Sequence, residues 1–221
     1  MRGYTEVLTV VAGVGLVVAT AACNSSSPGG SGTKSPSGKK PVGAFKTLTG
    51  NTTTVVLDPK FLMALKTLKL TPTPFGTAKI NGANAVFPIT GGKATIYKKG
   101  DVTPYIQGEV DHAGSGLTLT AGKTKVTIMN FVVYPGTGSS LTGDVAINGG
   151  TPLHAVKLFD LDGGTLKPPT ISAKGVATLK GTTIYLSNEA AAALNGVFKT
   201  SALAGGKKVK IGTAIIAATG K

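Results

Sequence analysis

Glu109, Asp111 and His112 form the densest group of ionisable side chains in the sequence. Carboxylates and imidazoles are the side chains that most often ligate metal ions or move protons in proteins. If this segment continues as a β-strand, Glu109 and Asp111 share one face and His112 points to the other. A metal site would need further ligands, such as His154, Asp160 or Asp162. The chain contains only two histidines and one cysteine. We therefore predict a solvated strand end here and no metal site.

Residues 160–164 read Asp-Leu-Asp-Gly-Gly, a second place where carboxylates lie close together. Carboxylate oxygens on a glycine-bent backbone suit calcium, but a third loop ligand and a glutamate at EF-hand spacing are missing. Aspartate is also common in turns, where its side chain accepts hydrogen bonds from the backbone. The pattern favours a turn that closes the strand containing Leu158.

The sequence contains no clear catalytic set for hydrolysis. A G-x-S-x-G nucleophile motif is absent, and Ser115 lies too near His112 in sequence for a usual nucleophile and base. Glu109 paired with Asp144 or Asp160 could serve as glycosidase carboxylates, but the sequence does not state their separation. We predict no catalytic residue and no enzyme activity, with an envelope hydrolase as an alternative.

The region from Ala85 to the C-terminus resembles the haem-uptake surface domain of corynebacterial transport proteins. The resemblance is carried by Ile106-Gln107-Gly108-Glu109-Val110-x-His112, Leu117-Thr118-Leu119, Tyr134-Pro135 and Gly212-Thr213-Ala214. It implies an all-β fold and haem binding through tyrosine and histidine. The chain lacks the tryptophan usual near the start of that domain, and no ligand position is carried over. Otherwise Tyr97, Tyr105, Tyr134 and Tyr185 are expected as half-buried strand residues.

The first residues have the pattern of a signal peptide. Arg2 supplies a positive charge, and residues 7–19 form an apolar run that ends in small residues before Cys23. A membrane-spanning helix needs about 20 apolar residues. We therefore predict that residues 1–22 are a cleaved leader.

The residues around Cys23 resemble the lipobox of bacterial lipoproteins. Ala21 and Ala22 are the small residues expected before the modified cysteine, whereas Thr20 stands where leucine is commonest. The resemblance implies a diacylglyceryl thioether on Cys23, which as the chain's single cysteine cannot form an internal disulfide. Two or three acyl chains would anchor the protein to a bilayer. The composition and the lipobox variant look actinobacterial.

The chain divides into three parts by composition. Residues 1–22 are the expected leader, residues 23–46 a lipidated cysteine with a Ser-, Gly-, Pro- and Lys-rich tether, and residues 47–221 a single β-rich domain. The net charge of +14 comes almost entirely from lysine. Anionic lipids or envelope polymers are possible partners, and solubility explains the charge equally well. Nucleic acid is not expected, because the lysines are scattered without interleaved aromatic residues.

Short β-rich segments separated by Gly, Pro, Asn and Asp predict a mainly β fold, an antiparallel β-sandwich or barrel-like domain. In the segment 117–120, leucine and threonine alternate, which indicates one buried and one wet face. The expected strands are 53–57, 77–80, 85–89, 94–97, 105–110, 117–120, 125–129, 131–134, 143–147, 155–158, 176–179, 183–186 and 208–216.

Two short helices are expected from an internal repeat. Residues 54–65 align without gaps on residues 183–194, and each segment has a strand, an N-cap at Asp58 or Ser187, and an apolar helix. Residues 76–80 then match residues 212–216. The helices are too short to be stable alone, so their apolar side chains should face the core: Phe61, Leu62, Leu65, Leu68, Leu194, Val197 and Phe198.

Together these patterns predict a lipoprotein anchored by Cys23 to the outer face of the bacterial cell membrane, with a non-enzymatic binding or structural role. A carrier of haem or another small hydrophobic ligand at the cell surface is the alternative from the binding class. No cofactor and no ligand-binding residue is assigned from the sequence.

Overall fold

The computed structural model describes residues 38–136 and 138–221. The expected leader, residues 1–22, and Cys23 lie outside the described residues. Within the described part, no helix is long and apolar enough to cross a membrane.

Strands dominate the described chain, and two α-helices and two short 3-10 helices interrupt them. The strands are β1 (Gly43–Phe45), β2 (Leu48–Leu57), β3 (Thr71–Gly76), β4 (Lys79–Asn81), β5 (Asn84–Pro88), β6 (Gly91–Ile96), β7 (Ile106–Ala121), β8 (Thr124–Tyr134), β9 (Ser140–Ile147), β10 (Leu153–Asp162), β11 (Thr170–Ile171), β12 (Ala177–Leu186) and β13 (Lys210–Gly220). The helices are α1 (Pro59–Thr67), α2 (Asn188–Phe198), η1 (Gly163–Thr165) and η2 (Gly206–Lys208).

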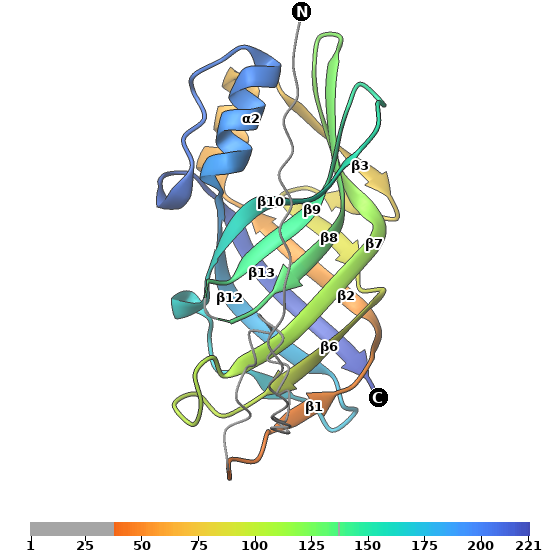
Figure 1. The fold of residues 1–221 in the computed structure, drawn as a ribbon, viewed down its shortest axis with the longest axis vertical. Helices are drawn as coiled ribbons and strands as arrows, with labels where there is room; N and C mark the ends of the chain where they lie inside the picture. The colour runs from red at the N-terminus through yellow and green to blue at the C-terminus, as the bar shows by residue number, and fades with distance from the viewer. Residues whose placement is uncertain (1–37, 137) are drawn as a thin grey trace, which may run out of the picture. The chain divides into compact units, whose positions relative to one another are not determined.

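All strands belong to one antiparallel sheet with the order β1-β6-β7-β8-β9-β10-β12-β13-β2-β5-β4, to which β3 adds on β7 and β11 on β12. The sheet is strongly curved (Figure 1). The curvature brings β5 into contact with β7 and β2 into contact with β6, although neither pair is adjacent in the strand order. The strand order stays open at β1 and β4, so the sheet is not a closed barrel. The predicted mainly β, sandwich-like fold with two helices is confirmed.

Three pairs of predicted strands are single long strands in the structure. β7, β8 and β12 each run through a bulge, at Gly114, Asn130 and Gly181, where the backbone φ is positive and the register shifts. Such residues were interpreted as strand ends, but in a strongly curved sheet they let one strand bend and continue. β3 was not predicted because it contains Pro72 and Pro74, and it pairs with β7.

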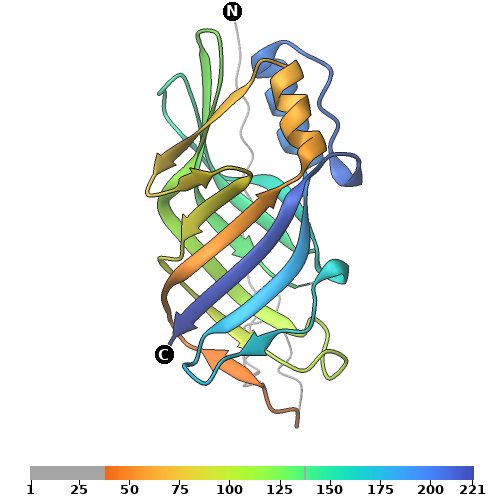
Figure 2. The same cartoon turned by 180° about the vertical axis from the view of Figure 1, so that it is seen from behind.

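Both predicted helices are present and begin at the predicted caps. The Asp58 carboxylate accepts a hydrogen bond from the Lys60 amide at 2.9 Å, and the Ser187 hydroxyl accepts one from the Ala190 amide at 3.0 Å. Six of the seven apolar residues predicted to face the core pack against it, and the seventh, Leu65, is buried. Figure 2 shows the two helices together at one end of the domain.

The internal repeat extends through each helix but not into the strand that follows. Residues 212–216 lie in β13, between β12 and β2. Residues 76–80 instead span the end of β3, a turn and the start of β4, which pair with β7 and β5. The second part of the sequence match therefore does not correspond to an equivalent strand.

Candidate ligand-binding cavity

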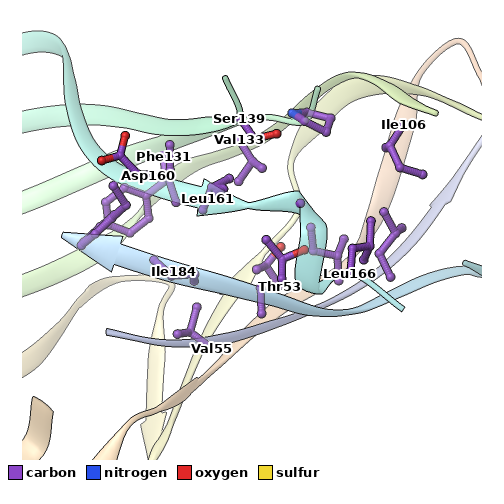
Figure 3. A pocket seen from close by; sticks show the side chains of 18 of the residues that line it. Thr53, Val55, Ile106, Phe131, Val133, Ser139, Asp160, Leu161, Leu166 and Ile184 are labelled. Atoms are coloured by element: carbon purple, nitrogen blue, oxygen red, sulfur yellow. The ribbon is translucent and has the colours of Figure 1, made fainter. Parts of the chain in front are cut away.

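The curved sheet encloses a cavity of about 580 Å³. Its wall is mainly aliphatic and aromatic, and Figure 3 shows Phe131, Val133 and Ile184 among the side chains around it. These residues come from β8 and β12, and Val55 of β2 and Leu161 of β10 add further wall. Cavities of this size and character are typical of small-molecule binding sites.

His112 lies in the wall of this cavity and is 1% exposed. Its Nε2 atom is 2.8 Å from the hydroxyl oxygen of Thr53 on β2, and its ring meets the edge of Phe87 on β5. Burial lowers the pKa of His112 from 6.5 to about 4, so the imidazole is neutral near pH 7.

The prediction of a solvated strand end at Glu109, Asp111 and His112 is thus wrong for the histidine. β7 continues to Ala121, and the curvature of the sheet brings β2 and β5 over the face to which His112 points. The sequence predicted that His112 faces away from its acidic neighbours. It did not indicate that this face is the interior.

Two buried polar atoms at the cavity have no hydrogen-bond partner within the described residues: Nδ1 of His112 and the hydroxyl of Tyr105. Burial raises the pKa of Tyr105, so its hydroxyl stays protonated. Buried polar groups in native proteins are almost always paired with protein, water or ligand. Both residues line the cavity, which makes them candidates to contact a polar group of a molecule inside it.

Loops and one ion pair complete the wall. Thr103 and Pro104 come from the segment before β7, and Ser139 from the turn between β8 and β9, where its hydroxyl accepts from the Gly136 amide at 2.9 Å. Lys157 and Asp160 of β10 also line the cavity and are joined at 2.7 Å. This hydrogen bond from the ammonium group to the carboxylate raises the pKa of Lys157.

The other ionisable residues considered in the sequence form separate pairs in the structure. Glu109 pairs with Lys93 at 3.6 Å, and Asp144 on β9 pairs with His154 at 3.1 Å. Asp162 caps η1 through the Gly164 amide at 3.0 Å and pairs with Lys207, which confirms a turn after Leu158. In the described part of the chain, no three His, Cys, Asp or Glu residues are grouped to hold a metal ion.

The four tyrosines of the described residues occupy different environments. Tyr105 lines the cavity, whereas Tyr134 is 40% exposed and neither Tyr97 nor Tyr185 contributes to the cavity wall. Sequence reasoning missed the wall residues on β2 and β5, such as Thr53 and Phe87. Segments 53–57 and 85–89 were expected as strands, but nothing in the sequence indicated that Thr53 and Phe87 line a cavity.

The fold is similar to that of solved structures. The C-terminal domain of HtaA from Corynebacterium glutamicum matches with a TM-score of 0.53 and 13% identity, over 78% of this chain and 98% of that domain. A domain-swapped dimer of a histidine-to-alanine variant of the same domain matches with a TM-score of 0.47 and 13% identity, over 73% and 91%. No family model and no curated protein matches the sequence. The corynebacterial resemblance drawn from the sequence is thus confirmed at the level of the fold.

Proposed function

We propose that this protein is a cell-surface carrier that binds a hydrophobic small molecule of about the size of haem. The observation that carries the proposal is the cavity of about 580 Å³, whose apolar wall contains the neutral imidazole of His112. The fold shared with the HtaA domain supports a binding role. Asp160 is the single carboxylate among the cavity-lining residues, and Glu109 and Asp144 lie outside this lining, which favours binding over hydrolysis.

Haem is the first ligand to test, because the wall offers side chains of the types that hold it. Neutral histidine, and tyrosine that loses its hydroxyl proton on binding the iron, both ligate haem iron, and His112 and Tyr105 are among the residues that line the cavity. Phe87 and Phe131, whose ring centroids are 5.2 Å apart, supply aromatic surface for a flat ligand. Bound haem would contribute an iron centre with exchangeable ligands, and the chain itself would only bind, shield and release it.

A haem titration of the purified full-length chain tests the proposal. We expect a Soret band that saturates at one haem per chain. Leu161→Trp should abolish it, because Leu161 lines the cavity and a larger ring would fill the space. Val56→Trp is the matched control, because Val56 neighbours the wall residue Val55 but is 40% exposed and outside the cavity.

A fluorescent fatty acid, titrated in parallel, separates haem from other apolar ligands. Binding of the fatty acid but not of haem would leave a hydrophobic carrier and remove haem as its ligand. Binding of neither probe, in a chain with the far-ultraviolet spectrum of a β protein, would overturn the proposed function.

We further propose that the carrier is exported and anchored through acylated Cys23 to the outer face of the cell membrane. The leader pattern of residues 1–22 and the single cysteine support this cellular location. Intact mass and membrane fractionation of the native protein beside a Cys23→Ser variant test it. An unmodified cysteine, with both forms soluble, would refute the anchor.

A further inference from the structure

One end of the domain is formed by three segments that meet around β1: residues 38–47, 97–105 and 170–176, here called the basal surface. The Val42 amide donates to the Ile96 carbonyl, and the Tyr97 amide to the Tyr105 carbonyl, both at 2.8 Å. Ile171 of β11 lies against β1, because a Cβ atom added to Gly43 would be 2.5 Å from its Cδ1. Figure 1 shows β1 at the end opposite to α2.

The basal surface is strongly basic. It contains six exposed lysines and one acidic side chain, that of Asp101. The lysines are Lys39, Lys40, Lys46, Lys98, Lys99 and Lys174. Elsewhere in the described chain several lysines pair with carboxylates, as Lys93, Lys157, Lys207 and Lys210 do, but none of these six does. The six positive charges are therefore available to an outside partner.

Two large apolar side chains are exposed among these lysines. Val42 is 56% exposed and Ile171 is 38% exposed. They lie near each other, since Ile171 contacts the position of Gly43. Apolar side chains flanked by lysines suit the boundary between lipid head groups and acyl chains, where the apolar part inserts and the ammonium groups stay among the phosphates.

We propose that the basal surface docks on an anionic lipid bilayer. Its charge is complementary to phosphate head groups, and its exposed valine and isoleucine can enter the acyl boundary. The chain outside the structure also joins the domain here, because Gly38 directly precedes Lys39 and Lys40. Lysines near an anionic surface contribute additively, and salt screens their attraction.

Docking would bring the cavity wall close to the bilayer. The segment 97–105 carries Lys98 and Lys99, and it also supplies Thr103, Pro104 and Tyr105 to the cavity. A hydrophobic ligand could then pass between lipid and cavity without crossing bulk water. This consequence rests on the proposed carrier function, whereas the docking itself does not.

The test compares two triple variants in the full-length chain with Cys23→Ser, so that no acyl chain contributes. The basal variant combines Lys98→Gln, Lys99→Gln and Lys174→Gln. The matched variant removes the same charge near the opposite end, from α1 and the β7–β8 turn, through Lys60→Gln, Lys66→Gln and Lys123→Gln. Partitioning is measured by co-sedimentation with phosphatidylcholine vesicles with and without phosphatidylglycerol.

One lysine near an anionic surface changes partitioning about fivefold, so the basal variant should bind the phosphatidylglycerol vesicles about 100-fold more weakly. The matched variant should stay within about threefold of its parent, because its lysines face away from the bilayer. On neutral vesicles the two variants should not differ. Equal weakening by both variants, or weakening by neither, would overturn the proposed docking surface.

A second pair of substitutions separates a bilayer from an anionic polymer. Val42→Ser with Ile171→Ser should weaken vesicle binding about tenfold and leave binding to soluble polyphosphate unchanged, because only a bilayer receives apolar side chains. If vesicle binding were unchanged and polyphosphate competed for it fully, the proposed docking on a bilayer would be overturned, and the partner would be an anionic polymer. Haem titration of the same variants tests the carrier function separately. A chain that does not bind haem but still binds the vesicles would contradict the carrier function and leave the docking proposal standing.

Discussion

Buried His112 should make the fold sensitive to acid. Its pKa is lowered from 6.5 to about 4 by burial, so between these values the unfolded chain binds a proton that the folded chain does not. Stability therefore rises with pH through this window and is lost as pH falls from about 6.5 to about 4. The shift corresponds to about 3 kcal/mol of unfolding free energy.

The assay is urea unfolding followed by far-ultraviolet circular dichroism, since the chain has no tryptophan. His112→Gln keeps a group that can hydrogen bond to Thr53 but does not titrate, so its unfolding free energy should fall about 3 kcal/mol less than that of the parent over this window. Carboxylates titrate alike in parent and variant, so their effect cancels. An identical loss of stability in parent and His112→Gln would refute the reasoning.

Two further predictions concern packing and capping. Ser187→Ala should lower the unfolding free energy by about 1–2 kcal/mol, because the buried hydroxyl caps α2 at Ala190; a change near zero in urea unfolding would contradict this. Gly143→Ala should cost about 1–3 kcal/mol, because its new Cβ would lie 2.9 Å from Phe131. Gly196→Ala, in open space within α2, should instead stabilise by up to about 1 kcal/mol. Thermal melts would contradict these two glycine predictions if both substitutions shifted Tm in the same direction.

Local patterns predicted the parts of the fold that depend on neighbouring residues. Asp58 and Ser187 cap their helices as predicted, because a cap hydrogen bond joins residues two or three positions apart. The alternation of leucine and threonine in residues 117–120 likewise indicated a strand, since it follows from backbone geometry alone. The turn at Asp162 has the same local origin.

Strand continuity could not be predicted in the same way. Gly114, Asn130 and Gly181 favour positive φ, which suits a turn and a bulge equally well. The difference depends on whether the partner strand continues alongside, and that partner is set by the whole sheet. The sequence therefore indicated where the backbone bends but not that β7, β8 and β12 continue past each bend.

The sequence by itself determined a mainly β chain with two capped helices, an excess of lysine and a leader pattern ending at Cys23, because these follow from composition, periodicity and short-range hydrogen bonds. The tertiary structure decided that the sheet curves until β2 and β5 face β7. Only this curvature turns His112 from an expected surface residue into a neutral imidazole beside an apolar cavity, since its environment comes from Thr53 and Phe87, which lie far from it in sequence. The basal surface has the same origin, because its three segments are separate in sequence and meet only in the folded sheet.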